Sequence, residues 1–228
     1  MKRFGIYLIR VFVEVFIYVA MVTLALVAWY CGFSHYNRKR SREVLTWIEA
    51  AFAGHGSLAG VHWRSPGRFL AHLKLRPNSC FQQAAIEVAL AQREIPHRWL
   101  EARIKRIPES LTFEADLEFA PLYVLEVHHQ RWCGRTRRKL PDNPETWPTQ
   151  HVTPLVITTR SDWQREITMM MSSLEASRES EILNVSFRRS SPHFIVTIAL
   201  SAIAPNAGGT ELFTVLQELA GSASASRF

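Results

Sequence analysis

The sequence has few cysteines and none of the usual metal-ligand spacings. Its three cysteines, Cys31, Cys80 and Cys133, are too few for a disulfide framework. Cys80 and Cys133 can pair in an oxidising compartment and stay thiols in the cytosol. His128 and His129 are neighbours, and neighbours in a strand point to opposite faces, so they cannot easily share one metal ion. We therefore predict no metal site, no cofactor and no catalytic residue.

A glycine cluster at 54–60 lacks the spacing of the loops that bind nucleotides or carry a catalytic serine. Its third glycine comes one residue too late for a dinucleotide-binding loop, and a helical pattern precedes it where a strand is required. Ser57 is flanked two residues away by His55 and Ala59, so it is not in a nucleophile elbow. The cluster predicts a flexible turn.

Charged residues are almost absent between Val11 and Phe33, where Glu14 is the only one. These 23 residues are enough for a helix to cross about 30 Å of hydrocarbon. The run is longer than the apolar region of a cleaved signal peptide, which has about 7–15 residues. We therefore predict a tail over 1–10 and a retained transmembrane helix over 11–33, in the inner or plasma membrane.

Basic residues flank this predicted membrane helix on both sides, so its orientation is nearly balanced. Lys2, Arg3 and Arg10 precede it, and a denser cluster at 38–40 and Arg42 follows it. Because positive charge close to a helix end resists translocation, the denser cluster predicts a cytoplasmic soluble part. The basic N-terminal tail supports the opposite arrangement, in which the soluble part is exported.

A second helix is expected in the juxtamembrane segment 34–57, directly after the basic cluster. Ser41 can cap this helix and Gly54 can end it. Its apolar residues recur at the spacing of one helical face, and they are Val44, Leu45, Ile48, Ala51 and Phe52.

Residues 58–130 alternate between apolar and polar side chains, as half-buried strands do. Turn signals separate the runs, among them Ser65-Pro66-Gly67. We predict an antiparallel β-meander domain with strands near 61–63, 69–75, 86–90, 100–104, 111–119 and 123–127.

The run at 111–119 has the strictest alternation and places three carboxylates on one face: Glu114, Asp116 and Glu118. Such a row resembles a metal or acid–base site. The predicted strand at 100–104 would present Glu101, Arg103 and Lys105 opposite the row. Because opposite charges commonly pair across strands, we expect a structural ladder at this hairpin.

Residues 131–150 combine crowded basic residues with Pro141, Pro144 and Pro148, which is typical of an exposed linker between domains. Basic residues together with Trp132 and Trp147 can also bind an anionic lipid surface or RNA. The chain after residue 33 has 24 basic and 19 acidic residues, a net charge of +5, which suits either partner. The residues predicted for that binding are Arg131, Arg135, Arg137, Arg138 and Lys139.

Residues 151–228 predict a ferredoxin-like domain with the element order β-α-β-β-α-β. Strands are expected at 152–157, 182–187 and 194–200, with a short last strand at 223–228. One helix is expected to begin at Ser161 or Asp162 and the other at Gly208-Gly209-Thr210. The whole chain is therefore expected to be α+β, with a transmembrane helix, a β-meander domain and this domain.

The element order and the closing helix–glycine–strand at 210–228 resemble ACT-like regulatory domains, such as the one that ends the MgtC/SapB membrane proteins. The resemblance covers about a third of the chain and implies a regulatory domain. That family has several membrane spans, whereas one is predicted here. ACT domains often have glycine in the first strand–helix loop, where this chain has Arg160-Ser161-Asp162, so an amino-acid effector is not implied.

Together these features predict a membrane-anchored binding, scaffold or regulatory module without enzymatic activity. Its partners would be the bilayer through the anchor, and a protein or a second copy through the C-terminal domain. One alternative is a membrane-bound hydrolase or thiol enzyme that uses Cys80 or Cys133 with a nearby histidine. Another is a binder of anionic lipid or RNA through the basic segment at 131–139.

Overall fold

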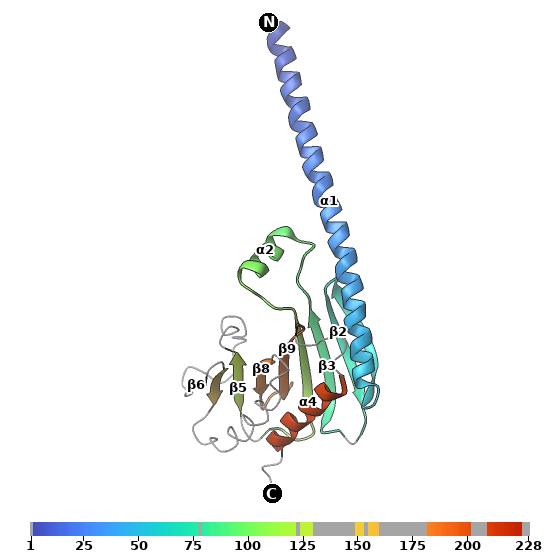
Figure 1. Ribbon diagram of the computed structural model, residues 1–228, viewed down its shortest axis with the longest axis vertical. Helices are drawn as coiled ribbons and strands as arrows, with labels where there is room; N and C mark the ends of the chain where they lie inside the picture. Colours follow the sequence, from blue (N-terminus) through green and yellow to red (C-terminus); the bar gives the residue numbers. More distant parts are fainter. Residues whose placement is uncertain are drawn as a thin grey trace.

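The computed structural model describes residues 2–77, 79–121, 124–129, 149–152, 155–159, 182–201 and 209–224, with the backbone alone described for the first turns and for some strand and helix ends. These residues form an α+β fold in which a long N-terminal helix stands on an antiparallel sheet (Figure 1). The predicted fold class is confirmed at this level.

The N-terminal helix α1 (Lys2–Phe52) runs without a break. Its first half exposes large hydrophobic side chains from Phe12 to Tyr30, and it is long and apolar enough to cross a membrane. The separate helix that was expected to begin at Ser41 is part of α1. Ser41 is buried within the helix, and its hydroxyl donates a 2.9 Å hydrogen bond to the carbonyl oxygen of Pro66.

The last turns of α1 pack against the sheet through one stripe of side chains. Val44, Ile48, Ala51 and Phe52 are buried, and residues three and four apart lie on the same face of a helix. Leu45 packs beside the stripe and is partly buried. The predicted amphipathic face is confirmed, and it is the C-terminal end of the same helix that carries the exposed apolar half.

The described strands form one nine-stranded sheet in which every described pairing is antiparallel. Its spatial order is β1 (Gly56–Ser65), β2 (Arg68–Leu75), β3 (Phe81–Ala89), β4 (Ser110–Leu117), β9 (Phe194–Ala199), β8 (Ile182–Phe187), β5 (Leu125–His129), β7 (Leu155–Thr159) and β6 (Thr149–Val152). Several of the strands predicted from alternation, including those near 69–75, 111–119 and 194–200, lie where they were expected.

The sheet joins the two parts of the chain that were expected to form separate domains. Strand β4 pairs with β9 from Ser110↔Ala199 to Ala115↔Phe194, so the meander and the C-terminal region share hydrogen bonds and one core. The division into domains at 58–130 and 151–228 is therefore wrong for the described strands. Most of the predicted linker lies outside the described residues.

The described C-terminal strands do not follow a ferredoxin-like order. In that order the first and third strands are neighbours, whereas here β7 pairs with β5 and β6, and β9 pairs with β4 and β8. The helix expected after Ser161 lies outside the described residues. The last described helix, α4 (Gly209–Ser224), still includes Ala223, where a strand was expected to begin.

The segment predicted as a strand at 100–104 is a helix, α2 (Pro96–Ile104). Proline at the first helical position favours this start because its fixed φ suits a helix and its missing N–H is not needed there. The expected charge ladder is therefore wrong: Lys105 pairs with Glu101 along the helix, and β4 lies between β3 and β9.

The glycine cluster is also more ordered than expected, because β1 begins at Gly56. A Cβ on Gly56 would lie 2.5 Å from the carbonyl oxygen of Lys74 and 3.0 Å from the Cα of Leu75. Glycine at this position therefore allows the close approach of β1 and β2. The prediction of a flexible turn is wrong from Gly56 onward.

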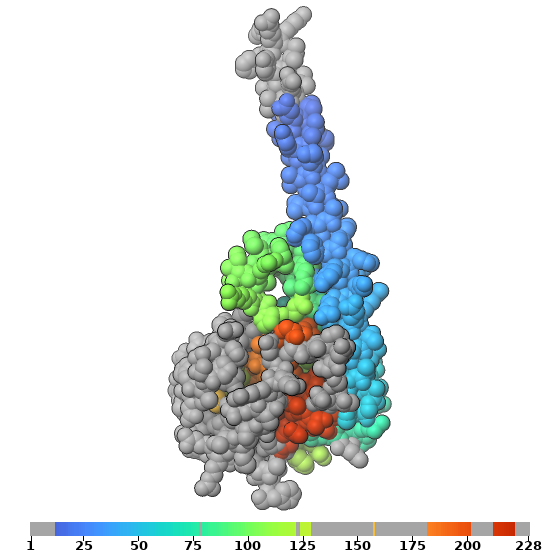
Figure 2. Space-filling view, in the orientation of Figure 1, coloured from blue at the N-terminus to red at the C-terminus, as the bar shows by residue number. Residues whose placement is uncertain are grey.

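One face of the sheet, which we call the core face, is covered by α1 and α4 (Figures 1 and 2). Aromatic rings join the two helices to the strands. The ring centroid of Phe52 lies 5.3 Å from that of Phe213 on α4 and 6.3 Å from that of Phe113 on β4. The opposite face, which we call the polar face, carries the site described next.

Candidate functional site

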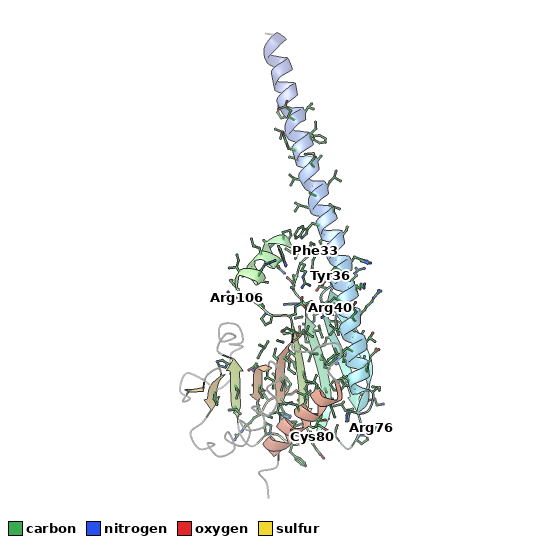
Figure 3. The ribbon with its side chains drawn as sticks, in the orientation of Figure 1. Phe33, Tyr36, Arg40, Arg76, Cys80 and Arg106 are labelled. Atoms are coloured by element: carbon green, nitrogen blue, oxygen red, sulfur yellow. The ribbon has the colours of Figure 1, made fainter. Side chains whose placement is uncertain are left out.

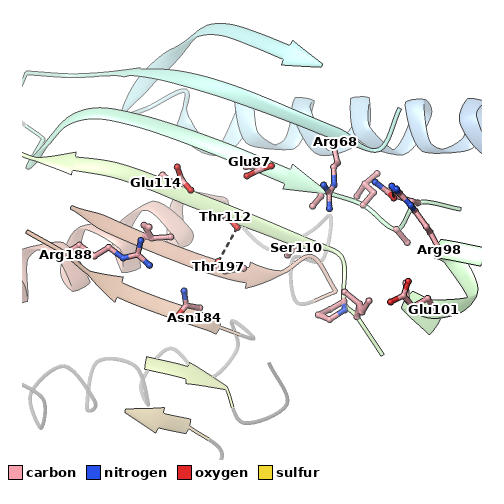
Figure 4. A pocket seen from close by; sticks show the side chains of 18 residues that line it. Arg68, Glu87, Arg98, Glu101, Ser110, Thr112, Glu114, Asn184, Arg188 and Thr197 are labelled. Atoms are coloured by element: carbon pink, nitrogen blue, oxygen red, sulfur yellow. Dashed lines mark hydrogen bonds between the residues drawn. The ribbon is translucent and has the colours of Figure 1, made fainter. Parts of the chain in front are cut away.

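A cavity of about 540 Å³ lies between α2 and the polar face of the sheet (Figure 4). Side chains from β2, β3, β4, β8 and β9 form its floor, and α2 with the loop before it forms a wall. The charged residues around it balance three arginines against three glutamates: Arg68, Arg98, Arg188, Glu87, Glu101 and Glu114.

The alternation of β4 produces this floor and the core together. Leu111 and Phe113 point to the core face and are at most 1% exposed. Between and beyond them, Ser110, Thr112 and Glu114 line the cavity. Successive side chains of a strand point to opposite faces, so a single strand serves both surfaces.

Asn184 is the most informative residue of the cavity floor. Its side chain is 3% exposed, and the amide oxygen Oδ1 is buried without a hydrogen-bond partner. Its neighbour across the sheet, Thr197, shares a 3.2 Å hydroxyl–hydroxyl hydrogen bond with Thr112. A buried hydrogen-bond acceptor without a partner lowers the stability of the fold. The amide oxygen of Asn184 can therefore accept a hydrogen bond from an N–H or O–H group that enters the cavity.

Charged side chains beside the floor are held by polar contacts. Arg188 Nε donates to Ser186 Oγ at 3.1 Å, and Arg98 Nη1 donates to Gln92 Oε1 at 2.9 Å. Burial raises the pKa of the Glu126 carboxyl on β5, while the positive charge of Arg188 opposes this effect. The cavity therefore presents donors, acceptors and both signs of charge.

The thiol chemistry considered from the sequence does not coincide with this cavity. Cys80 is a partly buried free thiol that packs against the core, and it does not line the cavity. Burial raises its pKa, which lowers the thiolate fraction that a nucleophile requires. Cys133 lies outside the described residues. Within the described ranges, no group of three or more histidine, cysteine or acidic side chains is arranged to hold a metal ion.

The residues predicted to bind an anionic surface, Arg131, Arg135, Arg137, Arg138 and Lys139, lie outside the described residues. The carboxylate row of β4 is divided in two. Glu114 lines the cavity, whereas Asp116 accepts a 3.0 Å hydrogen bond from the Ser191 hydroxyl. Sequence reasoning found the row and missed the cavity, because Arg68, Asn184 and Arg188 come from distant parts of the chain.

A buried polar junction fixes α1 to the loop that leads into α2. Asn37 Nδ2 donates to Glu94 Oε2 at 2.6 Å and to the Ala91 carbonyl oxygen at 3.0 Å. Asn37 and Glu94 are 0% and 6% exposed. Nearby, Arg93 pairs with Glu109 at 2.8 Å. Helix, loop and cavity wall are therefore held in one arrangement.

The comparisons with known proteins assign no family. No protein-family model matches the chain, and no curated protein sequence matches it significantly. The geometry of the cavity and of the junction therefore carries the functional argument.

Proposed function

We propose that this chain is a single-pass membrane-anchored binding protein whose cavity takes a small polar ligand with N–H or O–H donors. The unpartnered Asn184 Oδ1 on the buried floor carries this proposal. A buried polar group without a partner is costly in a folded protein, and a donor of the ligand would satisfy it. Thr112, Thr197 and the balanced charges around them would orient the ligand.

The junction with α1 supports a fixed position for the cavity near the membrane. The apolar half of α1 continues into the buried half without a linker, and Asn37 and Ser41 fasten the helix to the loop and to the β1–β2 turn. A protein that holds its site at a set height above the bilayer suits a binding or scaffold role.

The binding proposal is tested with the full-length chain in detergent micelles. Free amino acids, nucleosides and monosaccharides are the probes, and saturation-transfer NMR detects binding. We expect at least one class to bind the wild type and to lose its signal in Asn184→Leu. The control, Gln82→Leu, removes an exposed amide of β3 outside the cavity and should bind normally. No binding by the wild type, or equal binding by Asn184→Leu, contradicts the proposal.

We further propose that the domain lies in the cytoplasm, at the inner or plasma membrane, because Arg38, Lys39, Arg40 and Arg42 follow the apolar half of α1 closely. The test is labelling of Cys80 with a membrane-impermeant thiol reagent under mild denaturation, since this thiol is partly buried. We expect label only after permeabilisation. Label on intact cells would place the domain outside.

Two further proposals concern regions that lie mostly outside the described ranges. Anionic lipid or RNA is the proposed partner of Arg131, Arg135, Arg137, Arg138 and Lys139, and binding that is independent of salt would contradict it. A regulatory role of residues 151–228, through a protein partner or a second copy, is tested by cross-linking in membranes. Recovery of monomers alone would contradict that role.

A further inference from the structure

We propose that α2 is a second membrane contact, which lies on the bilayer surface and binds anionic lipid headgroups. This inference rests on the proposed membrane crossing of α1 and is independent of the cavity's ligand. Only three residues of α2, Arg98, Glu101 and Ala102, line the cavity. The other side chains of this helix have no role in the cavity.

One face of α2 is apolar and open. Leu100 and Ile104 are 53% and 72% exposed, and residues four apart lie on the same face of a helix. No residue of α2 is buried. Exposed hydrophobic residues gathered in this way are typical of helices that rest in the membrane interface.

The height of α2 is fixed by Trp29, near the end of the apolar half of α1. Trp29 Nε1 donates to the Arg93 carbonyl oxygen at 2.9 Å, and its ring lies 5.9 Å from that of Trp99 on α2. Figures 1 and 3 show α2 beyond the membrane-proximal end of the sheet, with Phe33 of α1 beside it. Tryptophans favour the boundary between hydrocarbon and water, so α2 is placed at that boundary.

The charges of α2 suit an anionic surface. Arg103 stacks on the Trp99 ring at 5.5 Å. Arg106 follows it on an exposed helix end, after Lys105, whose charge is paired with that of Glu101. The basic cluster at 38–42 lies nine to thirteen residues after Trp29 on the same unbroken helix, on the side away from the apolar half. An anionic headgroup layer is the partner that complements both basic segments.

Arg106 adds an independent observation from the backbone. Its φ of 47° is in the left-handed region, and the end of α2 has the hydrogen bonds of a Schellman motif, Arg106 N to Arg103 O and Ile107 N to Ala102 O. Glycine is the favoured residue at this position. Arginine is strained in this backbone conformation, but it places a positive charge at the end of the helix. The strain is consistent with a functional role of that charge.

The test uses the full-length chain, one copy per nanodisc, so that only lipid can cover α2. An environment-sensitive fluorescent amino acid replaces Leu100, Ile104, Phe16 or Arg76 in turn, in phosphatidylcholine alone or mixed with phosphatidylglycerol. We expect the fluorescence at Phe16, Leu100 and Ile104 to report an apolar, lipid-accessible environment. At Leu100 and Ile104 this signal should be stronger in the mixture with phosphatidylglycerol than in phosphatidylcholine alone. Arg76, at the far end of the sheet (Figure 3), should report water.

Arg106→Gly removes the cation while giving the backbone its favoured residue, so it tests charge without unfolding α2. Because one basic residue near an anionic surface contributes about a factor of five, the ratio of water-exposed to docked α2 should rise about fivefold. Arg106→Lys should keep the wild-type ratio. Water-like signals at Leu100 and Ile104, with Phe16 in lipid, would overturn the α2 proposal alone. A water-like signal at Phe16 would overturn the membrane anchor as well.

Discussion

The same strands form two faces of the sheet that differ in burial and polarity. On the core face of β4, Phe113 is fully buried beneath α1 and α4. On the polar face, the adjacent Thr112 lines an open cavity. Burial of apolar side chains stabilises the fold, whereas the polar face carries groups whose partners are incomplete, such as Asn184. Stability and binding capacity are therefore separated across one layer of backbone.

The largest expected effect comes from the core face. Phe113→Ala should lower the free energy of unfolding by about 3–5 kcal/mol, because it removes a ring packed against Phe52, Phe81 and Phe194 and leaves a cavity. Urea unfolding of the full-length chain in detergent, followed by near-UV circular dichroism, measures this loss. Thr112→Val on the other face should cost less, at most about 1–3 kcal/mol, because it leaves the buried Thr197 hydroxyl without its partner. Equal losses would remove the distinction between the faces.

The loss of a buried polar contact of α1 should have the second-largest effect. Asn37→Ala removes the donor to Glu94 Oε2 and leaves a buried carboxylate with one partner fewer. We expect a loss of about 1–3 kcal/mol in the same unfolding experiment. Glu43→Ala, which breaks an exposed pair with Arg40 on the same helix, is the control and should change little. A loss no larger than that of the control would show that the junction does not hold α1.

Substitution of Asn184 on the cavity floor should raise the free energy of unfolding or leave it unchanged, in contrast to the two losses above. Asn184→Leu replaces an amide whose Oδ1 is buried without a partner, so the unliganded chain should lose no stability and gain up to about 1 kcal/mol. Thermal unfolding without added ligand measures this change. A clear loss of stability would mean that Asn184 is a structural residue, and would remove the main support for the binding proposal.

The smallest effect concerns pH. The pKa of the Glu126 carboxyl is raised above its usual 4.5, so above this pH the folded chain binds more protons than the unfolded chain. The contribution of this carboxyl to the free energy of unfolding is therefore fully present below its usual pKa. It is lost as the pH rises through the raised pKa, because the buried carboxyl then ionises. Glu126→Gln should be more stable than the wild type at pH 7, and the difference should vanish in acid.

Unfolding of the wild type and Glu126→Gln is compared at several pH values, with Glu49→Gln on an exposed part of α1 as the control for lost charge. A constant difference at every pH would contradict the raised pKa. A difference that grows with pH would confirm the raised pKa. It would show that ionisation of the buried Glu126 carboxyl lowers the free energy of unfolding, an effect that the apolar side chains of the core face do not have.

The sequence by itself determined the features that depend on local periodicity. The run after Val11, in which Glu14 is the only charged residue, predicts an exposed apolar helix. The stripe from Val44 to Phe52 predicts a helix that is buried along one face. The alternation at 111–119 predicts β4 and its two faces. In each case the spacing of side chains along a helix or strand is set by backbone geometry, so no distant residue is needed.

Only the tertiary structure decided which of these elements meet. The short run at 100–104 suits a strand or a helix by periodicity, and proline at position 96 and the packing of Trp99 on Trp29 accompany the helix that forms. The β4–β9 pairing joins residues 79 to 89 positions apart, and the cavity depends on it. Which distant strands become neighbours depends on the apolar surface that the whole assembled sheet buries, so the cavity could not be derived from the sequence.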